Sequence, residues 1–275
     1  MTAVLLRGSG LAAEIRAEVL AASADLNRHG VDATLAVVVA TDDESSHWYV
    51  RSIAAAAKKT GTGCRIVDLG AVATEDQIGR QLDELSNDPS VHGIILQTPL
   101  PNGVSAAKLV GRVAPSKDVD GANPVSLGRL AVGEPAFPPA TARSVIELLD
   151  HHQIPLNGRH VAVVGRSNVV GKPLLHLLLQ RDATVTICHS RSNPLAQFTR
   201  PADIIAVAVG RAGLLTGDHV STGAVVIDVG TNVMADDSLV GDADAASVAS
   251  VASALSPVPG GVGSVTTALL LLHTV

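Results

Sequence analysis

The stretch HVAVVGRSNVVGKP, from His160 to Pro173, decides the fold class of this chain. It opens with a mainly apolar run of strand length, and a loop bounded by Gly165 and Gly171 follows before the next apolar segment. A strand that leads through a glycine loop into a helix directs backbone N–H groups and a helix N-terminus toward a phosphate. Because the loop departs from the strict G-x-G-x-x-G pattern, an ordinary strand-to-helix turn is the alternative interpretation.

The next predicted strand, Ala183–Cys188, ends at His189-Ser190-Arg191. Enzymes that bind NAD usually place an Asp or Glu at this point for the ribose 2′-hydroxyl. This chain has a hydroxyl and an arginine there instead, and Arg166 lies in the preceding loop. Because these groups suit a 2′-phosphate, the sequence predicts NADP as the cofactor.

Strand and helix patterns alternate on both sides of this segment. Continuous apolar runs such as Thr34–Thr41 are typical of parallel strands buried on both faces. The predicted strands are 34–41, 63–69, 91–96, 160–164, 183–188, 204–209 and 224–229, and the predicted helices are 10–30, 47–60, 74–86, 143–151, 172–180 and 266–274. The segment 99–139 is rich in Pro, Gly, Asp and Asn and is predicted to have few regular elements. We therefore expect two α/β domains with a boundary near 118–142.

The composition excludes several classes of protein. Apolar residues make up 47% of the 275 residues and the formal net charge is −6, which argues against disorder and against nucleic-acid binding. No apolar run approaches the roughly 18 residues that a membrane span needs, and the N-terminus lacks a signal-peptide pattern. Two cysteines are too few for a disulfide framework, and no histidine spacing suggests a metal site. We expect a cytoplasmic protein without a bound metal.

Motifs across nearly the whole chain resemble the bacterial FolD family of methylenetetrahydrofolate dehydrogenases/methenyltetrahydrofolate cyclohydrolases. The matching segments are Ser46–Val50, Gly93–Pro101, Lys117–Gly121, Gly165–Pro173, Ala183–Ser190, Val226–Gly230 and Pro257–Gly263. The resemblance implies a folate-binding catalytic domain, residues 1–118 with the C-terminal helix 262–275, and a Rossmann-like NADP-binding domain, residues 142–261. It places the active site in a cleft between them, and it implies tetrahydrofolate one-carbon derivatives as substrates and a homodimer.

The resemblance also implies roles for individual residues. It assigns Tyr49, Gln97 and Asp120 to catalysis, and Asp120 would accept two parallel N–H bonds from the pterin's amino-pyrimidinone edge. A turn-forming aspartate before Gly121 is the alternative for Asp120. The substrate would also contact Thr98, Pro99, Pro257, Val258, Pro259, Gly260, Gly261 and Val262. The cofactor would contact Gly165, Arg166, Ser167, Ser190, Arg191 and Thr231.

The chain departs from the family pattern on the folate side. Ile53 stands where the family's Tyr-x-x-x-Lys helix carries its lysine, four residues after Tyr49 and hence on the same helix face. Three further motifs are altered: Gln97-Thr98-Pro99 replaces Gln-Leu-Pro, the stretch 139–144 reads PATARS in place of Pro-Cys-Thr-Pro-x-Gly, and 263–266 reads GSVT in place of Gly-Pro-Met-Thr. The NADP-side motifs are intact.

These departures predict which of the two reactions survives. Hydride transfer to NADP needs the rings held together but no side-chain acid or base. Hydrolysis of the methenyl product needs proton transfers, and Ile53 can neither donate nor accept a proton. We therefore predict a dehydrogenase whose cyclohydrolase activity is weakened or lost, unless another base such as His47 replaces the lysine. The alternatives are an oxidoreductase acting on another cyclic amine or imine, and a folate- or NADP-binding pseudoenzyme.

Overall fold

The computed structural model describes residues 2–275, and the chain forms two compact units. Unit 1 contains residues up to 12 together with 141–266, and unit 2 contains 13–140 together with 267–275. The divisions fall inside three helices, α1 (Ser9–Arg28), α6 (Ala140–His151) and α10 (Val262–Leu272). Among residues 2–275, no helix is long and apolar enough to cross a membrane.

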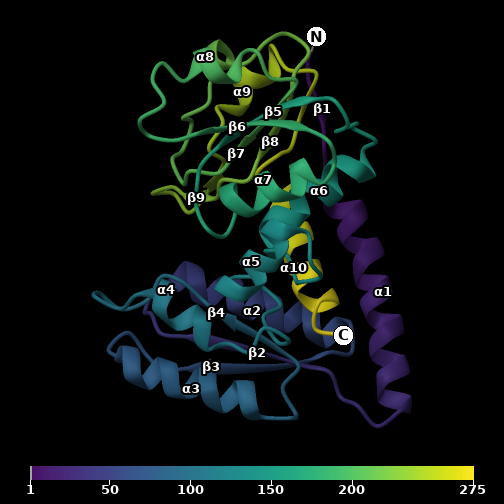
Figure 1. Cartoon of the computed structure of the whole chain (residues 1–275), viewed down its shortest axis with the longest axis vertical. Helices are drawn as coiled ribbons and strands as arrows, with labels where there is room; N and C mark the ends of the chain where they lie inside the picture. The colour runs from purple at the N-terminus through teal and green to yellow at the C-terminus, as the bar shows by residue number, and fades with distance from the viewer. Residues whose placement is uncertain (1) are drawn as a thin grey trace. The chain divides into compact units, whose positions relative to one another are not determined.

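Unit 1 is built on a six-stranded sheet whose neighbouring strands are all parallel (Figure 1). In sheet order the strands are β1 (Val4–Leu5), β11 (Ala254–Leu255), β8 (Val225–Asp228), β7 (Ile204–Val207), β5 (His160–Val164) and β6 (Thr184–Cys188). The other elements are α7 (Gly171–Leu179), α8 (Ala196–Thr199), η2 (Gly217–His219), α9 (Ala245–Ala249) and the antiparallel hairpin β9 (Asn232–Val233) and β10 (Leu239–Val240).

The apolar strands of unit 1 are buried on both faces, as parallel strands require. Along β5, Val161 and Val163 pack with residues of α6 and α7, whereas Ala162 and Val164 join a second cluster that includes Val248 of α9. Each face of the sheet therefore has its own apolar core. The run that begins at His160 needs no polar alternation because neither face meets solvent.

Unit 2 contains a smaller parallel sheet in the order β3 (Gly63–Asp68), β2 (Thr34–Val39), β4 (Gly93–Leu96). Its helices are α2 (Glu44–Lys59), α3 (Glu75–Asn87), α4 (Ala106–Leu109), η1 (Val110–Arg112) and α5 (Pro124–Val132), with most of α1 and the end of α10. Ile78 and Leu82 of α3 pack against Ala36 and Val38 of β2. Two α/β units with parallel sheets confirm the predicted fold class.

The predicted irregular region 99–139 is the main error of the sequence analysis. It contains α4, η1 and the nine-residue helix α5. Asn123 caps α5 by accepting a hydrogen bond from the Val125 N–H at 2.7 Å, Pro124 occupies the first turn, and Gly133 ends the helix at φ 78°. These are signals of the start and end of a helix. Pro, Gly and Asn are also typical of irregular segments, so the composition of 99–139 did not reveal the helix.

The domain boundaries also differ from those expected. The expected folate-binding domain comprises 1–118 with the C-terminal helix 262–275, whereas β1 pairs with β11, and both the residues up to 12 and residues 262–266 group with unit 1. Residues 119–140, near the expected boundary, group with unit 2. A two-residue strand has no periodicity to recognise, so only its long-range pairing reveals it.

Candidate functional site

The loop from Asp118 to Gly121 in unit 2 is held by buried polar groups. The Asp118 carboxylate accepts hydrogen bonds from the backbone N–H groups of Ala122 (3.0 Å) and Asn123 (2.9 Å), and burial raises its pKa. Gly121 has a φ of 63°, and a Cβ there would collide with the backbone of residues 137–139. Gly121 is therefore needed for a close approach as well as for its backbone angle. Both features fix the position of Asp120 between them.

Asp120 differs from Asp118 in having no protein donor. Among residues 2–275, no side chain or backbone N–H donates to its carboxylate, although the residue is half-buried. Burial raises its pKa to about 7, and the charge of Asp118 adds to the effect. A carboxylate in this state is suited to a ligand that brings its own N–H donors. The turn-forming alternative does not account for this, because Asp118 makes the hydrogen bonds of the turn.

Tyr49 of α2 lies close enough to Asp120 for the two to interact electrostatically. Burial, together with the charge of Asp120, raises the pKa of Tyr49 to about 12, and a hydrogen bond with Thr267 opposes the shift. Tyr49 is therefore a neutral phenol that can donate or accept a hydrogen bond but is not a base near neutral pH. The sequence analysis missed Thr267, which directly follows the altered motif at 263–266.

Ile53 lies one helical turn after Tyr49 and is fully buried. The buried face of α2 consists of Ser46, Val50, Ile53 and Ala57, whereas Lys58 and Lys59 are exposed. No ammonium group of α2 therefore takes the place of the family lysine. His47, the suggested replacement base, directs Nε2 to the Thr41 carbonyl at 2.9 Å, at the start of the helix.

Gln97, Thr98 and Pro99 follow the carboxyl end of β4. Gln97 Nε2 donates to the Thr98 carbonyl at 2.7 Å, and the Ser46 hydroxyl of α2 donates to the same oxygen at 3.4 Å. This segment is thus tied to the helix that carries Tyr49. Unit 2 brings Tyr49 and Asp120 together and ties the predicted Gln97–Pro99 segment to the same helix.

In unit 1, two glycines bring the loop after β5 against its neighbours. Gly165 has a φ of 133°, and a Cβ there would collide with the Ala208 carbonyl that follows β7. A Cβ at Gly171 would collide with the Gly165 carbonyl, so the start of α7 rests directly on the loop. The Ser167 hydroxyl accepts a hydrogen bond from the Val170 N–H at 3.1 Å. These close approaches are those of a dinucleotide-binding loop rather than of an ordinary turn.

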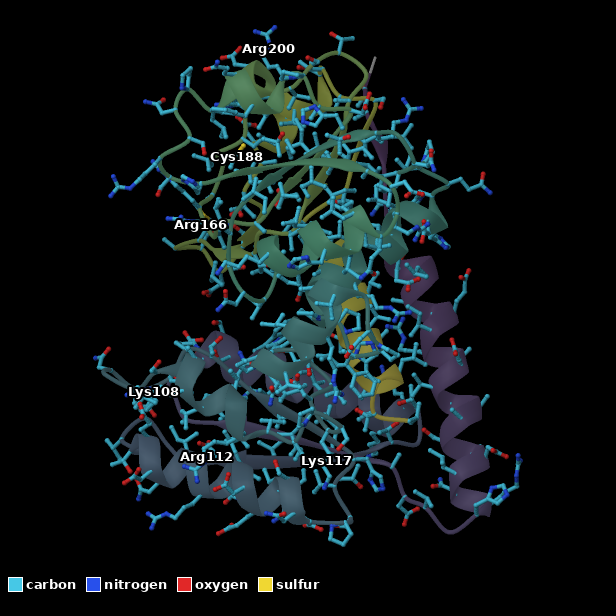
Figure 2. All side chains as sticks on the ribbon, in the orientation of Figure 1. Lys108, Arg112, Lys117, Arg166, Cys188 and Arg200 are labelled. Carbon is cyan, nitrogen blue, oxygen red and sulfur yellow. The ribbon has the colours of Figure 1, made fainter. Side chains whose placement is uncertain are left out.

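The ends of β5 and β6 place the predicted cofactor residues at one edge of the sheet. Val164 pairs with Cys188, and the Gly165 N–H donates to the Cys188 carbonyl at 2.9 Å. Arg166, Ser167, Ser190 and Arg191 are exposed, and Figure 2 labels Arg166 and Cys188 in this unit. The open glycine cradle and the exposed cations fit a bound NADP and its 2′-phosphate.

The remaining predicted residues also belong to unit 1. Thr231 is exposed and follows β8. The loop 257–261 leads into α10, which begins at Val262, and the Gly260 carbonyl accepts a hydrogen bond from the Gly8 N–H at 2.9 Å. The glycine-rich loop is therefore anchored to the N-terminal segment of the same unit.

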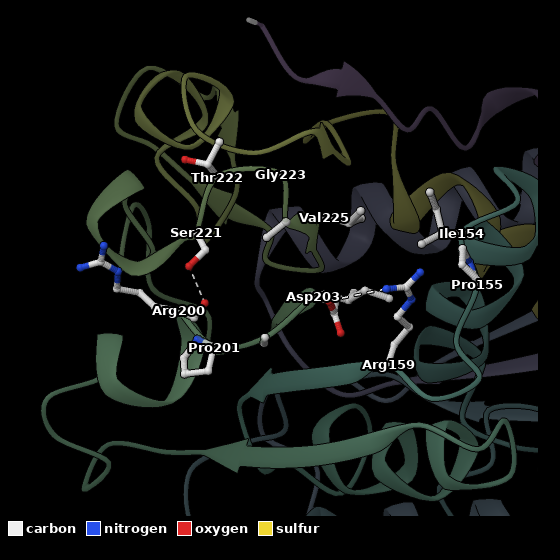
Figure 3. Close-up of a pocket in the computed structure, with 13 residues that line it drawn as sticks. Ile154, Pro155, Arg159, Arg200, Pro201, Asp203, Ser221, Thr222, Gly223 and Val225 are labelled. Carbon is white, nitrogen blue, oxygen red and sulfur yellow. Dashed lines mark hydrogen bonds and ion pairs between the residues drawn. The ribbon is translucent and has the colours of Figure 1, made fainter.

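A groove of about 410 Å³ lies at the opposite, amino-terminal edge of the unit 1 sheet (Figure 3). An Arg159–Asp203 ion pair at 3.8 Å and the backbone around Ser221 line it. None of the predicted site residues contributes to this groove. Ligands of parallel sheets bind at the carboxyl ends of the strands, so this groove is not the expected cofactor site.

Comparisons with known proteins agree with the predicted resemblance. The family described as tetrahydrofolate dehydrogenase/cyclohydrolase, catalytic domain, matches residues 6–120, and its NAD(P)-binding domain matches residues 139–275. A protein of Paenarthrobacter aurescens named bifunctional protein FolD 1 is 66% identical over 100% of this chain and 94% of its own length. The bifunctional protein FolD of Arthrobacter globiformis is 62% identical, with the same coverage of both chains.

Solved structures give the same result. The FolD methylenetetrahydrofolate dehydrogenase/cyclohydrolase of Campylobacter jejuni superposes with a TM-score of 0.95 at 38% identity, covering 98% of this chain and 96% of that one. The Trypanosoma brucei enzyme, solved with NADP and an inhibitor, has a TM-score of 0.94 at 35% identity and covers 100% and 96%. The resemblance predicted from the motifs is therefore confirmed, and this chain belongs to the tetrahydrofolate dehydrogenase/cyclohydrolase family, the FolD family of bacteria.

Proposed function

We propose that this protein oxidises 5,10-methylenetetrahydrofolate to 5,10-methenyltetrahydrofolate with NADP. The observation that carries the proposal is Asp120, a half-buried carboxylate without a protein donor beside the neutral phenol of Tyr49. The amino-pyrimidinone edge of a pterin presents two parallel N–H groups, which such a carboxylate can accept. Arg166 and Ser190, which are exposed in unit 1, support NADP over NAD.

The oxidation needs positioning more than proton transfer. A hydride leaves the methylene carbon, and a lone pair of the adjacent nitrogens forms the amidinium-type cation of the product. NADP, when bound, supplies the nicotinamide C4 that accepts the hydride. The role of the protein is to hold the folate in one orientation through Asp120, so the absence of the lysine leaves hydride transfer intact.

The family resemblance also supports a cytoplasmic homodimer and the binding roles of the loop 257–262.

The second reaction of the family is proposed to be weak in this chain. Water must attack the methenyl carbon, lose a proton, and deliver one to the departing nitrogen. Ile53 is fully buried and has no titratable group, and the raised pKa of Tyr49 keeps its phenol protonated near neutral pH. The relatives are named bifunctional proteins. We propose that this chain differs from them in having a weak cyclohydrolase activity.

The titration of Asp120 predicts a pH dependence of folate binding. Its pKa, raised to about 7 by burial, means that the acceptor form is lost as the pH falls through 7. The affinity for tetrahydrofolate should therefore fall about tenfold for each pH unit below 7 and level off above about 8. Equilibrium binding between pH 5.5 and 8.5 measures this, and Asp120→Asn should bind weakly with a flat profile. A flat wild-type profile, or the same slope in the variant, contradicts this role for Asp120.

The function itself is tested with methylenetetrahydrofolate and NADP in a spectrophotometric assay. We expect NADPH and methenyltetrahydrofolate to accumulate together, with a methenyl signal that persists. Consumption of the methenyl product would show that another group replaces the lysine. If neither signal moves, the dehydrogenase proposal fails; turnover of another cyclic amine would then favour a changed substrate, and NADP binding without turnover a pseudoenzyme.

A further inference from the structure

Two buried carboxylates, Asp228 and Asp242, join the loops at the carboxyl ends of β7 and β8. Asp228 is the last residue of β8, and its carboxylate accepts hydrogen bonds from the N–H groups of Gly230 (2.9 Å), Asp242 (3.0 Å) and Ala243 (2.8 Å). Asp242 follows the hairpin strand β10 and is fully buried. Burial raises the pKa of Asp228 to about 6, and the nearby charge of Asp242 contributes to the increase.

Asp242 binds three consecutive backbone groups of the loop after β7. Its carboxylate accepts hydrogen bonds from the N–H groups of Val209 (2.6 Å), Gly210 (3.0 Å) and Arg211 (2.7 Å), and from Asn232 Nδ2 (3.0 Å). Three successive N–H groups that converge on one carboxylate define the path of that loop. Hydrogen bonds to a charged acceptor are stronger than neutral ones, and a buried carboxylate is stable only when it is satisfied in this way.

Two glycines make room for these carboxylates. A Cβ at Gly230 would collide with the Asp242 carboxyl group, and a Cβ at Gly241 would collide with that of Asp228. The network therefore depends on small residues at both points, and its geometry leaves little freedom for the loops it joins.

The loop that Asp242 holds lies beside the glycine loop of the cofactor site. In the order β7-β5-β6, the strands that follow β5 in the chain lie on both of its sides, so the strand order reverses at β5. Dinucleotides bind at such a point, outside the carboxyl ends of the strands. The two loops touch there, because the Ala208 carbonyl directly faces Gly165 and the Ala208 N–H donates to the Val164 carbonyl at 2.8 Å. Residues 209–211 therefore form a wall next to the proposed cofactor site.

We propose that Asp242 is a positioning residue for NADP, which fixes the loop 209–211 without touching the cofactor. This inference rests on the proposed function, because it requires that NADP binds beside the glycine loop after β5. It predicts that removing the Asp242 charge loosens one wall of that site and leaves the folate-binding residues of unit 2 unchanged.

The test compares Asp242→Asn with a matched control, Asp236→Asn. Asp236 lies in the exposed turn of the same hairpin and accepts a hydrogen bond from the Ser238 N–H at 3.1 Å, so the control removes the same charge at the surface. Asp242→Asn should raise the Kd for NADP about 10- to 100-fold, with the Kd for tetrahydrofolate within twofold. Hydrogen exchange of the amides of residues 209–211 should become faster. Asp236→Asn should change none of these.

The outcomes separate this inference from the proposed function. If the wild-type protein does not bind NADP, the proposed function fails. If the wild-type binds NADP and a folded Asp242→Asn variant binds it equally well, or if NADP and tetrahydrofolate affinities fall together, the positioning role is wrong. If Asp242→Asn does not fold, Asn232→Ala provides the test, because it removes the side-chain donor to Asp242 (3.0 Å) together with a longer hydrogen bond to the Val240 carbonyl (3.3 Å), and it leaves the Asp242 carboxylate in place. It should weaken NADP binding a few-fold with tetrahydrofolate binding unchanged, and an unchanged NADP affinity overturns the role.

Discussion

Replacing Ile53 by lysine is expected to raise the rate of methenyltetrahydrofolate hydrolysis by about 10²- to 10⁴-fold. This is the range that a positioned general acid–base group typically contributes. The substituted side chain starts from the buried face of α2, one turn from Tyr49, whose neighbour Asp120 offers an opposite charge. The decay of the methenyl absorbance, with and without enzyme, measures the effect. The dehydrogenase rate should change far less, because hydride transfer needs no ammonium group.

Ile53→Met is the matched control for this prediction. It supplies an unbranched side chain of comparable length without a titratable group, so a gain in Ile53→Lys alone identifies the ammonium as the cause. Because position 53 is fully buried, the lysine is expected to lower the thermal unfolding midpoint, and rates are compared only below that midpoint. Rapid hydrolysis by the wild-type protein, with no increase in the variant, would show that another group already performs the step.

Removing Arg166 and Ser190 together is expected to abolish most of the preference for NADP over NAD. In the proposed site each side chain would offer the 2′-phosphate a hydrogen bond to a charged group, with a net contribution of about 1.5–3 kcal/mol. The double variant Arg166→Ala, Ser190→Ala should therefore lower the NADP/NAD ratio of kcat/KM by about 10²- to 10⁴-fold. Initial rates of methylenetetrahydrofolate oxidation with each dinucleotide give the ratio.

Arg200→Ala is the control for this second prediction. Arg200 is also exposed in the same unit and has the same charge as Arg166, but it follows α8 and lines the groove at the amino-terminal edge of the sheet (Figures 2 and 3). The ratio should not change in this variant. A similar decrease in both variants would indicate a general electrostatic effect of net charge, and no decrease in the double variant would place the 2′-phosphate elsewhere.

Local patterns were sufficient for most of the regular structure. The apolar run after His160 and the glycine loop predicted β5 and the start of α7, since burial on both faces leaves a continuous apolar strand. The predicted helix 74–86 corresponds to α3, and the spacing of Thr74 and Gln77 at its start is that of a capping box, both of whose hydrogen bonds are present. The sequence analysis does not predict α5, although Asn123, Pro124 and Gly133 mark its ends, because the same residue types are also typical of irregular segments.

By itself the sequence determined the fold class, the family, and the residue types available for folate and for NADP, including the isoleucine in place of a lysine. These properties depend on short-range periodicity and on motifs, which are local in the chain. Only the tertiary structure decided that β1 joins β11, that Thr267 meets Tyr49, and that Asp242 holds the loop at 209–211. Such contacts join residues far apart in the chain. Their energies depend on burial and on donor geometry, which a linear pattern does not contain.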